Sequence, residues 1–354
     1  MSEAATPAAL GYRMPAEWEP HAATWLAWPH ERGDWPGKFE AIPWVYAEAV
    51  RHLVAGERVR ILVDDARLQR SAQRVLRHAG VDLRRVDFVR IPTDRSWTRD
   101  TCPLFVRRHD GDVALVHWRF NGWAKYRNHR RDAAAGDALA RALGRRRWQP
   151  SLGRRPRHVV LEGGAIDVNG RGALLATEEC LLSRAQARNP GVTRAELERV
   201  LAVYLGVRKV LWLGRGIAGD DTHGHVDDVA RFADARTVVI AQEDDPADAN
   251  YGPLRENRAR LERMTDQDGR RLRVVALPMP APLAFGGQRL PASYANFYVA
   301  NTAVLVPTFN DVRDRQALAI LAGLFPSRPV VGIHAGDLVL GLGTLHCMTQ
   351  QEPG

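Results

Sequence analysis

The feature that most restricts the fold is a helical pattern that recurs at a nearly constant interval. Stretches with helical periodicity begin near residues 65, 132, 193, 254 and 311, and a short run rich in Val, Ile and Leu follows each one. An interval of about sixty residues indicates repeated supersecondary units, although no sequence motif recurs. Because five similar units close naturally around an axis, we expect an α/β fold with five-fold pseudosymmetry.

Local signals set the boundaries of these elements. Gly80 is a suitable C-cap, and Thr193 with Glu196 forms a capping box. The predicted helices are Trp44–Val54, Asp65–Ala79, a helix opening at Thr193, Asp132–Leu143, Leu254–Met264 and Asp311–Leu324. The predicted strands are Thr24–Trp28, Arg58–Val63, Arg85–Ile91, Val113–Trp118, His158–Leu161, Arg208–Leu213, Thr237–Ala241, Leu272–Leu277, Phe297–Val306 and Pro329–Ile333.

Polar clusters follow the strands of four of the five units. These clusters are Pro92–Asp100, Glu162–Gly164, Gly214–Asp228 and the glycine-rich loop that carries Cys347. Equivalent strands of repeated units end on the same side, so residues scattered over most of the chain would converge at one end of the axis. The pattern therefore predicts one central site.

Cys347 and His225 indicate the chemistry of that site. Cys347 lies in a glycine-flanked polar loop near the C-terminus, whereas a structural cysteine usually lies inside an apolar strand. A thiol paired with an imidazole suits covalent attack on an electrophilic carbon, because the imidazole can then protonate the leaving group. Asp227 follows His225 by two residues and would face the same cavity on an extended segment.

Carboxylates around this pair restrict the substrate. Asp100, Glu162 and Asp227 would place three negative charges beside the thiol, whereas an acyl-transfer site needs hydrogen-bond donors for an oxyanion. A planar guanidinium matches paired carboxylates, and its positive charge would favour the thiolate. Trp97 would stack on the cation. The sequence thus predicts a small cationic guanidine as substrate.

Other roles are open to several of these residues. A metal site is a rival, with His223, His225, Asp227, Asp228 and Cys347 as ligands. The chain has neither a CxxC nor an HExxH motif, so we expect no metal. We expect small buried side chains at Cys102 and Cys180, a surface carboxylate at Asp94 and a structural ion-pairing arginine at Arg99.

The net charge of +9 raises the alternative of a basic nucleic-acid-binding module that uses Arg119–Arg157. This stretch includes Arg145–Arg147, Arg154 and Arg155, but it lacks the interleaved aromatic residues of a base-stacking platform. We therefore expect no nucleic-acid partner. The chain has three cysteines, no long apolar run and no N-terminal signal pattern. These features favour a reduced, cytoplasmic protein with no membrane partner.

Seven segments carry a family pattern in the same order along nearly the whole chain. They are Met14–Pro29, Trp97–Asp100 (W-x-R-D), Leu161–Gly164 (E-G-G), Gly224–Asp227 (G-H-x-D), Ser293–Asn301, Val306–Asp311 and His346–Pro353. Through them the chain resembles the agmatine deiminases and the bacterial-type peptidylarginine deiminases, which are guanidine-modifying enzymes.

The resemblance implies a five-fold αβ propeller, the pentein fold, as a single catalytic domain over residues 1–354 with the site at its centre. Cys347 would be the nucleophile, and His225 the general acid and then the base. Asp100 and Asp227 would bind the guanidinium nitrogens, and Glu162 would support the imidazolium and the substrate. The resemblance implies no metal or organic cofactor.

Three residues depart from the family pattern near the substrate tail. Agmatine deiminases commonly carry Glu, Asn and Asn where this chain has Asp221, His223 and Asp228. We expect Trp97, Asp221 and His223 to contact the substrate. The expected reaction converts agmatine and water to N-carbamoylputrescine and ammonia. Peptidyl C-terminal arginine and other alkylguanidines remain alternative substrates, and a homodimer remains open.

Overall fold

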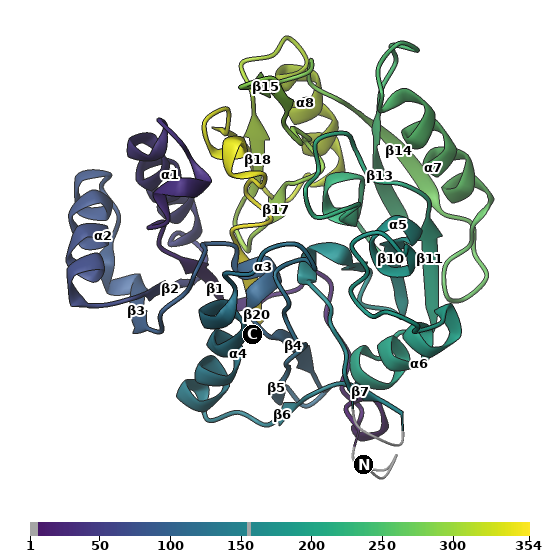
Figure 1. Ribbon diagram of the computed structural model, residues 1–354, viewed down its shortest axis with the longest axis horizontal. Helices are drawn as coiled ribbons and strands as arrows, with labels where there is room; N and C mark the ends of the chain where they lie inside the picture. The colour runs from purple at the N-terminus through teal and green to yellow at the C-terminus, as the bar shows by residue number, and fades with distance from the viewer. Residues whose placement is uncertain (1–5, 154–156) are drawn as a thin grey trace.

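The computed structural model describes residues 6–153 and 157–354. Within them, five small mixed sheets surround a centre, and the main helices lie outside the sheets (Figure 1). The strand orders are β20-β1-β2-β3, β4-β5-β6, β9-β10-β11, β12-β13-β14 and β17-β18-β19. The N-terminal residues used in the signal prediction, Met1–Ala5, and two arginines of the basic stretch, Arg154 and Arg155, lie outside the described residues.

Four sheets share one plan: an antiparallel strand pair, then a helix, then a strand parallel to the second strand. The second sheet has β4 (Leu104–Arg107), β5 (Val113–Val116), α4 (Arg130–Leu143) and β6 (Arg147–Trp148). The third has β9 (Asp167–Val168), β10 (Ala173–Thr177), α5 (Glu178–Leu182), α6 (Arg194–Leu205) and β11 (Lys209–Leu213). The fourth has β12 (Ala230–Phe232), β13 (Thr237–Gln242), α7 (Tyr251–Arg263) and β14 (Arg273–Pro278). The fifth has β17 (Tyr298–Val299), β18 (Val304–Thr308), α8 (Asp314–Leu324) and β19 (Val330–His334).

The first sheet contains the first and the last strand of the chain. Its elements are β1 (His21–Ala27), α1 (Ile42–Leu53), β2 (Arg58–Val63), α2 (Ala66–His78), β3 (Val86–Arg90) and β20 (Gln350–Pro353). The last strand, β20, pairs antiparallel with β1, with Gln350 opposite Trp25. The residues just before β20 are therefore fixed at the centre, and Cys347 is among them (Figure 1).

The predicted helices are confirmed to within a few residues, and the capping box of Thr193 and Glu196 forms at the start of α6. The predicted strand His158–Leu161 is wrong. Arg157–His158 (β8) pairs with β7 (Ser151–Leu152), outside the five sheets, and Val160 forms only an isolated parallel bridge with Arg119. The prediction for Phe297–Val306 merged two strands, because a turn between Val299 and Val304 makes β17 and β18 an antiparallel pair.

Apolar side chains pack between the sheets and the helices. In α6, for example, Leu197, Leu201 and Tyr204 join the same core cluster as Leu174 of β10. The buried charged side chains of the centre, such as Asp100, Glu162 and His225, instead come from loops and short turns between the strands. The fold thus provides a hydrocarbon frame around a polar centre. No helix among the described residues is long and apolar enough to cross a membrane.

Candidate active site

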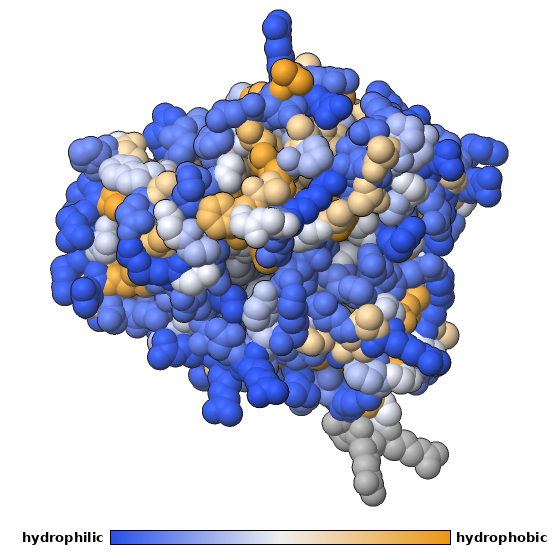
Figure 2. Space-filling model, turned by 45° about the horizontal axis from the view of Figure 1, so that its top comes forward, coloured by the Kyte–Doolittle hydropathy of each residue, from blue (hydrophilic) through white to orange (hydrophobic). Residues whose placement is uncertain are grey.

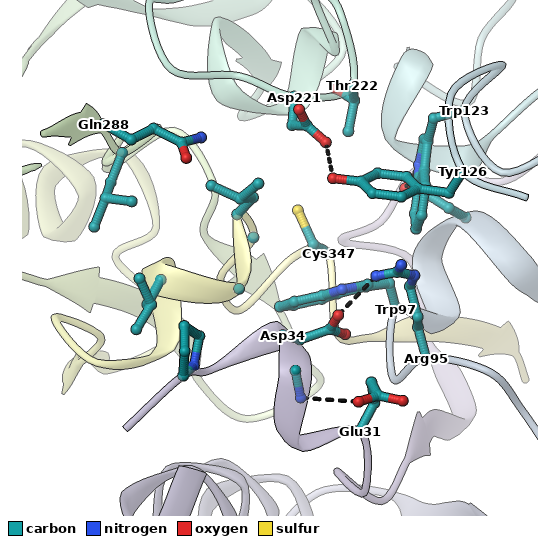
Figure 3. Close-up of a pocket in the computed structure, with 18 of the residues that line it drawn as sticks. Glu31, Asp34, Arg95, Trp97, Trp123, Tyr126, Asp221, Thr222, Gln288 and Cys347 are labelled. Atoms are coloured by element: carbon teal, nitrogen blue, oxygen red, sulfur yellow. Dashed lines mark hydrogen bonds and ion pairs between the residues drawn. The ribbon is translucent and has the colours of Figure 1, made fainter. Parts of the chain in front are cut away.

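A pocket of about 460 Å³ leads to Cys347 (Figure 3). The pocket-lining residues that matter below are Asp34, Arg95, Trp97, Asp100, Trp123, Tyr126, Asp221 and Cys347. Around it the surface is mostly hydrophilic, with pale and apolar side chains gathered near the middle of the face in Figure 2. The residues come from loops of separate propeller units, as the strand-end pattern predicted.

The Cys347 thiol is buried, with 7% of the residue exposed. Its Sγ lies 3.1 Å from Asn296 Nδ2 and 3.6 Å from Asp227 Oδ2. Burial, followed by the nearby carboxylates of Asp227, Asp228 and Asp100, raises the pKa of this thiol well above its usual value. The thiol therefore sits in a site that disfavours a thiolate unless positive charge arrives.

His225 lies among three carboxylates. Its Nδ1 is 3.8 Å from Asp100 Oδ2 and 3.9 Å from Asp227 Oδ1, and its Nε2 is 3.9 Å from Glu162 Oε2. Burial alone would lower the pKa of His225, but the neighbouring groups, Asp100 first, raise it well above the usual value. The ring can therefore hold a proton for a leaving group.

Gly164 explains how these groups come so close together. A Cβ at this position would lie 2.5 Å from His225 Nδ1 and 3.0 Å from oxygens of Asp100 and Asp227. No side chain fits there, so the second glycine of the E-G-G motif keeps the space between the imidazole and the two carboxylates open.

The carboxylates of Glu162 and Asp100 are held differently. Arg188 donates Nε–H to Glu162 Oε1 at 2.9 Å. Burial would raise the pKa of Glu162, but Arg188 and His225 lower it to about 2. Asp100 accepts from Trp123 Nε1 at 2.8 Å and from the Gly164 amide at 2.9 Å, and burial raises its pKa. Neither hydrogen-bond donor to Asp100 is charged, and the nearest positive group is His225, at 3.8 Å.

The residues predicted to contact the substrate divide into two groups. Trp97 lines the pocket and packs against Trp35, with ring centroids 5.6 Å apart. Asp221 also lines it, and Lys125 and Tyr126 both donate to its carboxylate. His223 is not among the lining residues; its Nε2 lies 3.4 Å from Ser183 Oγ.

Other sequence expectations concern buried residues outside the pocket. Arg99 is a structural ion-pairing residue, because its Nη2 lies 3.2 Å from Glu17 Oε2 and both side chains are buried. Cys102 is buried in an apolar cluster, and burial raises its thiol pKa to about 12. Asp94 is half-buried rather than fully exposed, because its Oδ2 accepts from the Arg131 amide.

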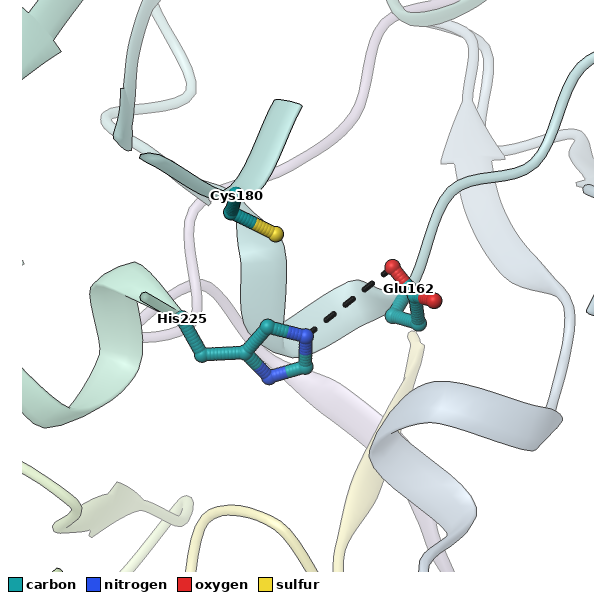
Figure 4. Close-up of side chains that lie close together, drawn as sticks. All are labelled: Glu162, Cys180 and His225. Atoms are coloured by element: carbon teal, nitrogen blue, oxygen red, sulfur yellow. Dashed lines mark ion pairs between the residues drawn. The ribbon is translucent and has the colours of Figure 1, made fainter. Parts of the chain in front are cut away.

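Cys180 is buried as expected, but it lies beside the imidazole and not in a remote core. Its Sγ, Glu162 and His225 have ligand atoms within 4.8 Å of one another (Figure 4). This is the one such group of three potential metal ligands among the residues that the structure describes, and it differs from the rival metal set considered above. The carboxylate of this group already binds the Arg188 guanidinium.

Several residues of the site were missed from the sequence. Asn296 contacts the thiol, Arg188 binds Glu162 and Trp123 binds Asp100. Asn296 lies inside one of the seven family segments, so its position was a usable signal. Arg188 gave no signal, because one arginine among 50 basic residues stands out neither by type nor by spacing.

Comparison with known proteins decides the family. A family model for Porphyromonas-type peptidyl-arginine deiminases matches residues 13–353. The chain belongs to this family. This deiminase is 36% identical to the agmatine deiminase of Pseudomonas aeruginosa (strain LESB58), over 98% of this chain and 97% of that one.

Solved structures agree over the full length of the deiminase. The agmatine deiminase of Enterococcus faecalis matches with a TM-score of 0.89 and 31% identity, covering 98% of this chain and 97% of that one. A cysteine-to-serine variant of C. jejuni agmatine deiminase with substrate bound matches with a TM-score of 0.84 and 27% identity, covering 96% of each chain. The predicted family and pentein fold are confirmed, and the protein is a hydrolase that acts on carbon–nitrogen bonds of linear amidines.

Proposed function

We propose that this deiminase hydrolyses agmatine to N-carbamoylputrescine and ammonia through a covalent intermediate on Cys347. One observation carries the proposal: a buried thiol and an imidazole share a site with carboxylates, two of which keep capacity for a further cationic partner. Asp227 Oδ1 is buried without a hydrogen-bond partner, and the donors to Asp100 are uncharged. A guanidinium would supply the missing charge and donors on two edges.

The first half-reaction forms the covalent bond. Asp100 and Asp227 bind the guanidinium nitrogens and hold its carbon near Cys347 Sγ. As the guanidinium binds, the Cys347 thiol releases its proton to solvent. The thiolate adds to that carbon, and the carbon–nitrogen bond to the terminal amino group breaks. His225 protonates the departing nitrogen, so ammonia leaves and an alkylthiouronium remains on Cys347.

The second half-reaction restores the enzyme. His225, now neutral, takes a proton from a water molecule that attacks the thiouronium carbon. The carbon–sulfur bond breaks, the ureido product leaves, and the thiol returns to its starting state. Glu162 supports the imidazolium in both halves, because its Oε2 faces His225 Nε2 at 3.9 Å and Arg188 keeps it ionised.

The raised pKa of Cys347 fits this substrate. Burial, together with the nearby carboxyl groups of Asp227, Asp228 and Asp100, raises the pKa of the Cys347 thiol and holds the free thiol protonated. A guanidinium that binds those carboxylates offsets the charge, and the thiolate then becomes accessible when the electrophile is in place. A neutral or anionic substrate would offer no such compensation.

The substrate tail extends toward Asp221 and Tyr126 at the pocket opening. The relative from Pseudomonas aeruginosa and the solved structure from Enterococcus faecalis are both agmatine deiminases. Each aligns with nearly the whole chain. Their agreement supports agmatine over peptidyl arginine, the substrate in the family description. Trp97 lines the wall of the pocket and supports stacking on the guanidinium.

The test is an ammonia assay with purified protein across agmatine, free arginine, peptides ending in arginine and methylated arginines. We expect the highest kcat/KM with agmatine. A buffer free of amines separates hydrolysis from amidino transfer, because a transferase would release no ammonia there. Preference for an arginyl peptide would replace agmatine as substrate, and no ammonia from any guanidine would end the proposal.

A further inference from the structure

His346, the residue before Cys347, lies between two buried carboxylates. Its Nδ1 is 2.7 Å from Asp227 Oδ2, and its Nε2 is 2.9 Å from Glu17 Oε2. The side chain is 2% exposed. Sequence patterns singled out His346 as part of the nucleophile segment, but the reaction above gives it no role.

The two contacts together fix the protonation of the ring. A neutral imidazole carries one N–H and can satisfy one carboxylate, whereas an imidazolium donates from both nitrogens. Burial opposes ionisation of both carboxylates, but Arg231 lowers the pKa of Glu17, and the contact with His346 itself lowers the pKa of Asp227. The geometry therefore requires a proton on each ring nitrogen.

All charged groups around the ring belong to one buried network. Asp227 comes from the short turn Val226–Asp228, and Glu17 from the segment before β1. Arg99 Nη2 and Arg231 Nη2 hold Glu17 at 3.2 and 2.9 Å, and Arg231 Nε also binds Asp167 at 3.1 Å. Arg99 Nε further donates to the His346 carbonyl at 3.3 Å. Both arginines bind Glu17, so His346 at 2.7 Å is the nearest positive partner of Asp227, and His225 lies farther away at 3.9 Å.

Asp227 differs from Asp228 and Asp100 in the direction of its pKa shift, as a positive partner at His346 would require. Burial and neighbouring carboxylates raise the pKa of Asp228 well above its usual value, and burial raises that of Asp100. The pKa of Asp227 is lowered although burial opposes it, because His346 binds it. His346 occupies Oδ2, and Oδ1 remains buried with no partner, 3.9 Å from His225 Nδ1.

We propose that His346 is a positioning residue, held as an imidazolium, that keeps Asp227 ionised and turns its free Oδ1 toward the guanidinium. The effect on guanidinium binding rests on the proposed function, whereas the charge of the His346 ring does not. In this role, the residue beside the nucleophile determines which of the closely spaced carboxyl groups is ionised.

The activity test compares His346→Asn with His21→Asn. Asparagine can still donate to Asp227 from the Nδ1 position, so the first variant removes the charge and keeps one hydrogen bond. His21 is an equally buried control: its ring binds Glu57 Oε1 at 3.2 Å and the Glu17 carbonyl at 2.7 Å, and the structure gives it no contact with Asp227 or Cys347.

We expect His346→Asn to raise KM for agmatine about 10- to 100-fold at pH 7, the range of a charged hydrogen bond. The acidic limb of kcat/KM should move upward by about one pH unit, because Asp227 loses its cation and ionises at higher pH. His21→Asn should leave that limb in place. An unmoved limb in His346→Asn, or an equal movement in both variants, would overturn the proposal.

A second measurement, on the wild-type protein, tests the proposal even if His346→Asn does not fold. His346-Cys347 is the one His-Cys dipeptide in the sequence, so paired isotope labels on histidine and cysteine identify its ring signals by NMR in the wild-type protein. We expect protons on both ring nitrogens at pH 7 to 8, without substrate. A neutral ring would refute the proposal whether or not the enzyme acts on agmatine, whereas failure of the ammonia assay would refute the function alone.

Discussion

The floor and the mouth of the pocket differ in how their carboxylates are balanced by positive charge. The floor is the buried group Asp100, Glu162, His225, Asp227 and Cys347; the mouth is Asp34, Arg95, Lys125, Tyr126 and Asp221. In the mouth each carboxylate has a cation: Arg95 lies 2.7 Å from Asp34, and Lys125 pairs with Asp221. In the floor, the carboxylates of Asp100, Glu162 and Asp227 surround the single imidazole of His225. Buried atoms without a hydrogen-bond partner occur in both regions, for example Asp227 Oδ1 in the floor and Asp34 Oδ2 in the mouth.

This difference teaches where the substrate is held. Buried negative charge is costly unless it is compensated, so a binding site that retains an excess of carboxylates is arranged for a cation that arrives later. The floor is incomplete without a cation with several donors, whereas the mouth is already neutralised. We therefore expect the floor to set chemistry and guanidinium affinity, and the mouth to adjust the choice of tail.

The largest effect should come from Cys347→Ser. A hydroxyl in this carboxylate-rich site has no route to an alkoxide, so kcat should fall by at least about 10⁴-fold. The thermal unfolding midpoint should stay close to that of the wild type, because the substitution is nearly isosteric. Full ammonia release by this variant would end the covalent mechanism and with it the distinction between floor and mouth.

Asp227→Asn and Asp221→Asn form a matched pair across the two regions. We expect the floor variant to lose about 100- to 1000-fold in kcat/KM for agmatine, because a buried charge–charge contact disappears. The mouth variant should lose about tenfold or less, mainly in KM, because Lys125 already offsets Asp221. Steady-state kinetics at one ionic strength measures both, and equal losses would contradict the comparison.

Alkylation of Cys347 reports the charge of the floor without turnover. Burial and the surrounding carboxylates hold the thiol pKa above the ordinary value of about 8.5, so iodoacetamide should inactivate the free enzyme slowly until the pH exceeds that value. In Asp227→Asn the midpoint should move to lower pH, since one negative charge is gone. A midpoint at or below that of a free thiol in the wild type would remove the case for a cation-dependent thiolate.

Asp34→Asn should have the smallest effect on activity. Its main effect should be on the pH dependence of stability. Burial raises the pKa of Asp34 to about 6, although Arg95 opposes the shift. A raised carboxyl pKa means that the folded protein binds this proton more tightly than the unfolded chain, so its stabilising contribution is present at low pH and is lost as pH rises through about 6. The free energy of unfolding, measured with denaturant at pH 4, 5, 6 and 7, should fall less with rising pH in the variant than in the wild type, by about 2 kcal/mol at most. Parallel curves for both proteins would contradict the assignment.

The sequence predicted the floor better than its surroundings. Cys347, His225, Asp100, Glu162 and Asp227 lie in segments with specific patterns at matched strand ends, and they meet as expected. Their supporting partners could not be predicted in this way. Arg188 reaches Glu162 from a loop after α5, and Glu17 reaches His346 from the opposite end of the chain. Such contacts depend on how the propeller closes, which periodicity does not describe.

The same limit applies to the strands. Long units such as β2 and β13 were predicted because several consecutive apolar residues mark them. The strands β9 (Asp167–Val168) and β17 (Tyr298–Val299) have two residues each, too few for any alternation to be detected. The strand β20 reads Gln-Gln-Glu-Pro, which has no strand signature, and its pairing with β1 is fixed by tertiary closure.

The most direct test of the central claim is mass spectrometry of enzyme quenched in acid during turnover of agmatine. We predict that a fraction of the peptide containing Cys347 carries the mass of the alkylthiouronium, that the adduct vanishes in Cys347→Ser, and that neither Cys102 nor Cys180 is modified. Rapid ammonia release by an enzyme that never carries the adduct, or an adduct on another cysteine, would contradict the account.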